Sequence, residues 1–215
     1  MSELIEDERT ARQTLRERTH LLRKSAQALT GILDDVLDHA KIESGQFELN
    51  LTSAEPGSEI SSAVEMCRAP ADEKGRQRVV GIEDNVPAYA EFDALRVRQI
   101  IGNWVSNAVK YTETGQVLVG ARGEQVDGQT VLTVEVSDTG RGMTPDQTAQ
   151  LLTAFYRAED KNALSVPGTG LGLSIAPRFA HMIEGELTVS SSPGRGRCFT
   201  STRSLSGLRT AAIAH

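Results

Sequence analysis

The sequence predicts an α+β protein, in which a two-layer sandwich with helices on one face of a mixed sheet follows a long N-terminal helix. Apolar residues recur every seven positions over residues 15–40, as in a coiled-coil helix. Further along, alternating β-branched runs such as residues 131–136 are typical of strands, whereas residues 96–112 have apolar side chains at helical spacing. Helices packed against one face of such a sheet form two layers.

The N-terminal helix begins in a highly charged segment, residues 1–18, which we interpret as a lead-in to the helix or as a frayed terminus. The seven-residue repeat predicts a coiled-coil seam of about four heptads, and Gly45 ends the helix. The seam comprises Leu15, Leu22, Leu29 and Val36, with Ala26, Leu33 and Ala40 near the intermediate positions. We therefore expect a helical domain at residues 1–45, a second domain at residues 46–205 and a tail at residues 206–215.

The second domain is expected to open with an extended linker at residues 46–57 and an amphipathic helix at residues 58–67. Its later elements are strands at 78–82, 116–121, 130–136, 186–190 and 198–202, a helix at 96–112, and turns at 85–87, 123–128 and 193–194. Pro177 lies inside a further helix, which it should bend. From Ser206 the chain has little pattern, which indicates a disordered tail or a linker.

Two glycine clusters, residues 138–143 and residues 168–173, flank a long and largely polar loop. The first follows a predicted strand and the second runs into a predicted helix that starts near Ser174. Glycines at these places let backbone N–H groups approach a phosphate closely, and a helix N-terminus favours an anion. A single cluster of this kind also occurs in ordinary turns, so the order of strand, acid, glycines, loop, glycines and helix carries the interpretation.

A third motif lies on the predicted helix at residues 96–112. Asn103 and Asn107 are four residues apart and share a face, with Lys110 close to one turn further on. Amide oxygens in this arrangement can hold a hydrated Mg²⁺, which takes its other ligands from water and substrate phosphates. The alternative is a surface helix with two exposed asparagines.

Together these motifs resemble the ATP-binding domain of sensor histidine kinases, in the superfamily shared with gyrase, the heat-shock chaperone ATPase and mismatch-repair ATPases. Residues 103–112 match the asparagine box and residues 138–143 the first glycine box. Residues 155–157, Phe-Tyr-Arg, match the phenylalanine box, and residues 168–173 the second glycine box. The resemblance spans roughly residues 21–200 and implies ATP and Mg²⁺ as cofactors.

The resemblance assigns a role to each site residue. Asp138 would accept a hydrogen bond from the adenine amine and so favour ATP over GTP, unless it is merely a turn aspartate. Asn107 would bind Mg²⁺, Asn103 would position a water or the hydration shell of the metal, and Lys110 would neutralise phosphate charge, which makes Asn103 and Lys110 the catalytic pair. The remaining nucleotide-binding residues would be Tyr111, Gly140, Gly142, Met143, Phe155, Arg157, Gly168, Thr169, Gly170, Leu171, Gly172 and Leu173.

Residues 33–45 are similar to the end of the second dimerisation helix of histidine kinases, which implies a homodimer through the N-terminal helix. The family's acceptor histidine is followed by an acid and then by an arginine-threonine-proline. His20 is instead followed by Leu21, and His39 lies in the segment where the second helix ends. We therefore expect the phosphorylated histidine on an acceptor helix outside this chain. A response regulator receiver domain is the further expected partner.

The function implied is that of an ATP-dependent protein-histidine kinase, the catalytic core of a two-component signalling system, which transfers the γ-phosphoryl group to a histidine outside this chain. One alternative is a nucleotide-binding pseudokinase or dimeric phosphotransfer module that acts by interaction. A chaperone-type or gyrase-type ATPase is disfavoured because this short chain of 215 residues lacks the transducer domain that those enzymes need.

Composition excludes other classes of protein. A net charge of −6 and a pI near 5.3 give no basic surface for nucleic acid. No apolar run approaches the length of a membrane span, and the N-terminus does not read as a signal peptide. The two cysteines, Cys67 and Cys198, belong to no metal-binding or disulfide motif and are interpreted as two small core or surface residues, in keeping with a reducing compartment. A cytoplasmic chain is expected, whose parent protein could be soluble or membrane-anchored.

Overall fold

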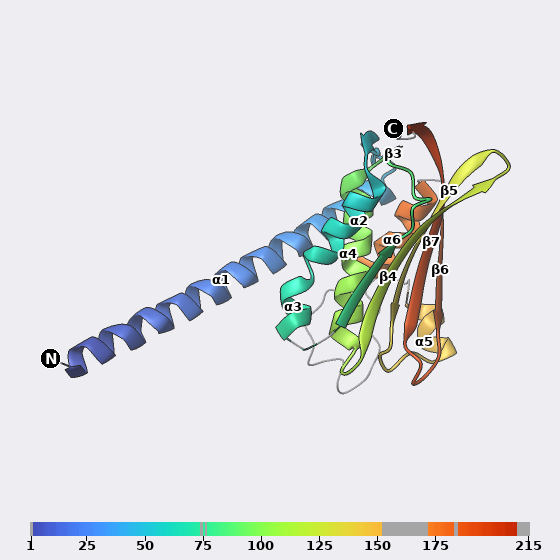
Figure 1. The fold of residues 1–215 in the computed structure, drawn as a ribbon. Coiled ribbons are helices and arrows are strands. Elements are labelled where there is room, and N and C mark those ends of the chain that lie inside the picture. Colours follow the sequence, from blue (N-terminus) through green and yellow to red (C-terminus); the bar gives the residue numbers. More distant parts are fainter. Residues whose placement is uncertain (1, 74, 76, 152–171, 183–184, 210–215) are drawn as a thin grey trace, which may run out of the picture. The chain divides into compact units, whose positions relative to one another are not determined.

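The computed structural model describes residues 2–73, 75, 77–151, 172–182 and 185–209 (Figure 1). The chain divides into two compact units, Met1–Gln46 and Phe47–His215. Among the described residues, no helix is both long and apolar enough to cross a membrane.

The first unit is one continuous helix, α1 (Ser2–Glu43). It ends where predicted, because Gly45 adopts a positive φ of 68° and the N–H of Gln46 donates to the carbonyl of Lys41 at 3.0 Å. Residues 2–14 continue the helix, as the interpretation of this segment as a helical lead-in expects. Large apolar side chains of α1 that are exposed include Leu15, Leu22, Leu29, Leu33, Val36 and Leu37.

The second unit is built on one mixed sheet. Its strands are β1 (Thr52–Ala54), β2 (Gln77–Ile82), β3 (Tyr89–Phe92), β4 (Gln116–Val126), β5 (Gln129–Asp138), β6 (Gly185–Ser191) and β7 (Arg197–Arg209). Their order is β1-β3-β7-β5-β4-β2, with β6 also paired to β7. The pair β2–β4 is parallel and the other pairs are antiparallel.

The helices of the second unit are α2 (Pro56–Glu65), α3 (Arg68–Glu73), α4 (Ala94–Tyr111), α5 (Pro145–Gln150) and α6 (Gly172–Met182). Figure 1 shows α2, α4 and α6 on one face of the sheet, which confirms the predicted two-layer sandwich. The layers meet at a core in which Trp104 of α4 stacks on Phe199 of β7, with ring centroids 5.7 Å apart. Pro177 lies inside α6, as predicted.

Helix α4 places the polar motif. The carboxylate of buried Asp93 caps it, since Oδ1 accepts from the N–H of Arg96 at 3.1 Å and Oδ2 from the N–H of Asn50 at 3.0 Å. Its apolar face is buried against the sheet through Ile100, Ile101, Trp104, Val105, Ala108 and Val109. The opposite face therefore keeps Asn103 and Asn107 partly accessible.

Several elements differ from the sequence prediction. The expected linker contains β1, which has no strand pattern of its own and is held by pairing with β3, an element that was not predicted. The central hairpin turns at Asp127 and Gly128, which have φ of 50° and 80°, rather than over residues 123–128. Strand β7 extends past Ser206 to Arg209, because its end pairs with β3. Such partners are distant in sequence and leave no local pattern.

Candidate functional site

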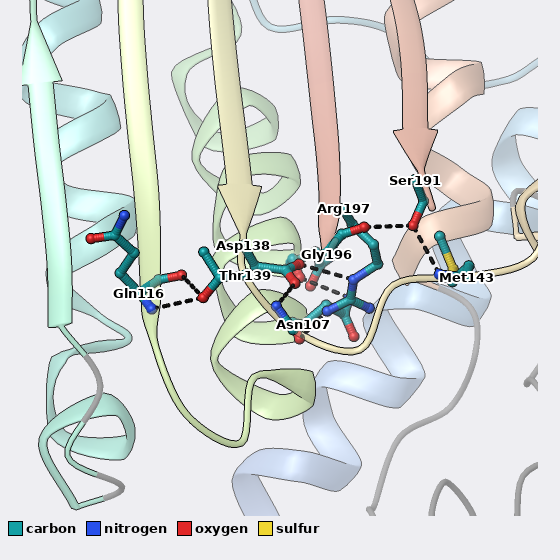
Figure 2. Close-up of polar contacts among 10 residues, drawn as sticks. Asn107, Gln116, Asp138, Thr139, Met143, Ser191, Gly196 and Arg197 are labelled. Atoms are coloured by element: carbon teal, nitrogen blue, oxygen red, sulfur yellow. Dashed lines mark hydrogen bonds and ion pairs between the residues drawn. The ribbon is translucent and has the colours of Figure 1, made fainter. Parts of the chain in front are cut away.

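The site is centred on Asp138, the last residue of β5. Its Oδ1 accepts a hydrogen bond from the backbone N–H of Gly140 at 2.9 Å, and its Oδ2 accepts from Nε of Arg197 at 2.9 Å (Figure 2). The Asp138 side chain is 1% exposed and that of Arg197 is 6% exposed. The two residues thus form a buried, hydrogen-bonded ion pair, in which charge assistance shortens and strengthens the bond.

Arg197 connects three elements. It opens β7, where its backbone pairs directly with that of Asp138. A terminal nitrogen of its guanidinium donates to the backbone carbonyl of Asn107 on α4 at 3.1 Å. Figure 2 shows the arginine side chain between the end of β5 and α4. The ion pair therefore joins β5, β7 and α4 at one point.

Tyr111, at the end of α4, lies among three cations. Nζ of Lys110 is 4.9 Å from its ring centroid, and the guanidinium carbons of Arg141 and Arg197 are at 5.5 and 4.8 Å. Cations at these distances are attracted to the face of an aromatic ring. The concentration of positive charge around one half-buried ring suits an anionic ligand such as a phosphate.

Two glycines allow the close approach that builds the site. A Cβ on Gly140 would lie 2.7 Å from the Tyr111 carbonyl oxygen and 2.8 Å from Oδ1 of Asp138. A Cβ on Gly196 would lie 1.7 Å from the Asp138 carbonyl oxygen, and its φ of 79° is also unfavourable for other residues. The turn between β6 and β7 can therefore pack directly on the end of β5, which brings Arg197 to Asp138.

The loop after Asp138 is fastened at both ends. Thr139 Oγ1 accepts from the N–H of Gln116 at 3.0 Å, and the N–H of Met143 donates to Oγ of Ser191 at 2.9 Å. Oγ of Ser191 in turn donates to the carbonyl of Gly196 at 2.7 Å. These contacts, drawn in Figure 2, hold the first glycine cluster against the β6–β7 turn.

The polar face of α4 offers an amide oxygen. Nδ2 of Asn107 donates to the backbone carbonyl of Asn103 at 2.8 Å, so this bond does not use Oδ1, the atom able to bind a metal. The described residues contain no group of three or more His, Cys, Asp or Glu side chains placed to hold a metal ion. A cation here would therefore take its other ligands from water and from a bound phosphate.

The structure brings together much of the predicted site. Gly140 and Asn107 bond to the ion pair of Asp138 with Arg197, and Tyr111 packs on it. Lys110 contacts the Tyr111 ring, and Asn103 lies one turn before Asn107. The loop continues through Gly142 to buried Met143, whereas Gly172 opens α6 and Leu173 is half-buried there. Other predicted residues lie outside the described part of the chain, namely Phe155, Arg157, Gly168, Thr169, Gly170 and Leu171.

Sequence reasoning missed Arg197. It follows the glycine-rich turn at residues 193–196, which the sequence marks only as a turn. Its partner Asp138 is 59 residues earlier, so their contact depends on the pairing of β5 with β7. The local feature that could have indicated its role is its place directly after Gly196, a glycine that packs closely on the end of β5.

The chain matches the model of a known family. Residues 92–205 match the model described as "Histidine kinase-, DNA gyrase B-, and HSP90-like ATPase". These residues include the whole of α4, β5 and the ion pair of Asp138 with Arg197.

Similar proteins include the autoinducer 2 sensor kinase/phosphatase LuxQ of Vibrio parahaemolyticus, 32% identical over 94% of this chain and 24% of its own length. The two-component system protein A of Emericella nidulans is 33% identical over 89% of this chain and 29% of its own. The chain spans from 10% to 29% of the length of such curated relatives.

Solved structures with a similar fold include full-length ShkA in complex with AMPPNP, with a TM-score of 0.74 and 31% identity over 92% of this chain and 40% of that one. The histidine kinase AdeS of Acinetobacter baumannii has a TM-score of 0.65 at 18% identity, covering 85% of this chain and 81% of that one, and so shares the fold.

Proposed function

Because the chain belongs to the histidine kinase-, DNA gyrase B- and HSP90-like ATPase family, we propose that it binds ATP with Mg²⁺ and serves as the catalytic core of a protein-histidine kinase. The observation that carries the proposal is the buried Asp138 carboxylate, set at a strand end between the glycine loop and the amide face of α4. Relatives named as a sensor kinase/phosphatase and as a two-component system protein support it.

The residues present fit ATP. A carboxylate oxygen can accept more than one hydrogen bond, so Asp138 can receive the exocyclic amine of adenine while Gly140 still donates to it. Guanine carries a carbonyl at that position and gives Asp138 no donor. Two cations beside Tyr111, Lys110 of α4 and Arg141 of the glycine loop, gather at the neighbouring end of α4, where they can meet the phosphates. Arg197 already donates to Asp138, so the base has to share this carboxylate or take it over.

The polar face of α4 fits a hydrated Mg²⁺. Oδ1 of Asn107 would ligate the ion, Asn103 would hold a water of its shell, and Lys110 would neutralise phosphate charge. Bound ATP supplies the phosphoryl group, and phosphoryl transfer needs positioning and charge neutralisation more than covalent help from the protein. We assign further phosphate and loop contacts, on resemblance, to Gly142, Met143, Phe155, Arg157, Gly168, Thr169, Gly170, Leu171, Gly172 and Leu173.

The acceptor histidine is proposed to lie outside this chain. A phosphorylated histidine needs a general base beside it, and His20 is followed by Leu21 rather than by an acid. His39 does follow an acid, Asp38, but lies in the last turns of α1, where the helix ends. Helix α1 exposes the apolar seam that a homodimer would bury. We therefore propose a homodimer through α1, an acceptor helix and a response regulator receiver domain as partners, and a cytoplasmic location for this chain.

A second candidate function follows from the ion pair. Because Arg197 already donates to the carboxylate that would receive adenine, nucleotide binding could be weak enough for the chain to act through interaction, as a pseudokinase or a dimeric phosphotransfer module. Turnover of ATP separates the two candidates.

The test is incubation of the purified chain with γ-labelled ATP and Mg²⁺, with and without an added acceptor-helix hairpin from a histidine kinase. We expect acid-labile label on the hairpin and none on the chain alone, together with ATP binding that GTP does not match. Equal calorimetric affinity for GTP and ATP would contradict the role of Asp138. Strong label on the chain that disappears in His20→Ala would contradict an external acceptor.

A further inference from the structure

Arg197 makes to Asp138 the contact that an adenine amine would make. Its Nε–H donates to Oδ2 at 2.9 Å, and its planar guanidinium lies over the ring of Tyr111 at 4.8 Å. An adenine base likewise offers an N–H donor on a flat, delocalised group. We propose that Arg197 is an affinity-determining residue of the nucleotide site, which occupies Asp138 in the absence of ligand and has to leave it when adenine binds. This inference rests on the proposed function.

Burial shows why the two donors compete. The side chain of Asp138 is 1% exposed, although the proposed function requires a ligand to reach it. One of its oxygens faces the N–H of Gly140, whose position is fixed because even a Cβ there would clash. The group that can move is the Arg197 side chain, since a long arginine has many rotamers and a backbone N–H in a packed loop has none.

The second contact of Arg197 indicates what holds it in place. Its terminal nitrogen donates to the carbonyl of Asn107, so the guanidinium is bonded on two sides and packed on a third by Tyr111. Leaving Asp138 requires both hydrogen bonds to break. The apparent dissociation constant for nucleotide is the intrinsic constant divided by the fraction of molecules in which the arginine has left the carboxylate.

Recognition of the base and recognition of the phosphates respond differently to the loss of a cation. Removing a cation near a triphosphate weakens binding by simple electrostatics. Removing Arg197 should instead strengthen the binding of adenine nucleotides, because the carboxylate becomes available to the amine. The gain should vanish for inosine nucleotides, which place a carbonyl acceptor where adenine would present its amine donor to Asp138.

The experiment compares the wild-type chain with Arg197→Ser and with Arg195→Ser, by calorimetry with Mg-ADP and Mg-IDP. Arg195 is exposed in the same turn, so the control removes the same charge by the same substitution away from Asp138. We expect Arg197→Ser to bind ADP at least about tenfold more tightly, the size of one lost charge-assisted hydrogen bond. Arg195→Ser should bind ADP no more tightly than the wild type, and IDP should gain nothing from either substitution.

A folded Arg197→Ser that binds ADP as weakly as the wild type, or more weakly, would overturn the inference while leaving the proposed function intact. An equal gain for IDP would overturn it as well. Saturable binding of neither nucleotide by any of the three proteins would overturn the proposed function and the inference with it.

A second measurement follows the Nε–H of Arg197 in the wild-type chain by NMR, so it does not require removal of the arginine charge. In the wild-type chain, the Nε–H of Arg197, assigned by its absence in Arg197→Lys, should be protected from solvent exchange, because it is buried and bonded. Saturating ADP should shift this signal and abolish its protection. A signal that stays protected and unshifted in the complex would mean that the arginine remains on Asp138, and would overturn the inference.

Discussion

Asp138 and Arg197 are paired twice, because their backbones face each other where β5 ends and β7 begins and their side chains are joined by a 2.9 Å ion pair. The same two residues therefore contribute to the sheet and to the candidate ligand site. A substitution at either one changes both stability and recognition, and the two effects need separate measurements.

The stability effect is predicted for Asp138→Ala. Loss of the carboxylate leaves the Arg197 guanidinium buried without its ionic partner, which lowers the free energy of unfolding by ~3 kcal/mol. Urea denaturation measures this, with Glu113→Ala as a control that removes an exposed carboxylate nearby. Equal losses in the two variants would mean that the ion pair does not stabilise the fold.

The metal role of Asn107 is tested by Asn107→Ala. This variant keeps the backbone carbonyl that accepts from Arg197 and removes the proposed Mg²⁺ ligand. We expect the enhancement of ATP binding by Mg²⁺ to fall by about tenfold, with binding in EDTA little changed. Titration of ATP with and without the metal measures it, and Ser106→Ala on the exposed side of α4 is the control. An unchanged response to Mg²⁺ would remove Asn107 from the metal site.

The seam of α1 is predicted to form a dimer. Leu22 and Leu29 are 70% and 58% exposed in the single chain, and glutamate at both positions should prevent association because it would bury like charges. Sedimentation velocity should then give a monomer for Leu22→Glu combined with Leu29→Glu. Asp34→Lys, which changes the charge of α1 off the seam, should remain a dimer. A wild-type monomer at all concentrations would contradict the prediction.

The two cysteines are predicted to react slowly. Burial raises the pKa of the Cys67 thiol and that of the Cys198 thiol, so fewer thiolates form in the folded chain than in the unfolded one. Both thiols should react with a disulfide reagent at pH 8 much more slowly in buffer than in urea. Since the folded pKa values are raised, their contribution to stability is complete below the ordinary thiol pKa of about 8.5 and is lost as pH rises further. Equal rates in the two solvents would contradict the burial.

Local chemistry explains which parts of the molecule could be predicted. Asn103 and Asn107 of α4, and Gly140 two residues after Asp138, could be predicted because their spacing along the chain defines their geometry. Strand β1 and the end of β7 were misassigned because pairing with β3 holds them. The role of Arg197 could not be predicted for the same reason, because it depends on the register in which β5 pairs with β7. That register leaves no local pattern in the sequence.

The contact between Asn50 and Asp93 has a mechanical consequence. The backbone N–H of Asn50 donates to Oδ2 of the carboxylate whose Oδ1 caps α4. Between residue 46 and Asn50, the Phe47 ring packs on Phe179 with centroids 5.1 Å apart and lies 4.9 Å from the guanidinium carbon of Arg96. Tension along the segment that leaves α1 would therefore reach the first turn of α4 by two routes, through Arg96 and through the Asp93 carboxylate. Because a helix is stiff along its axis, that load would reach the turn carrying Asn103 and Asn107. Pulling on the chain from residue 46 in an optical trap, with and without Asp93→Ala, would measure how much force this one carboxylate transmits.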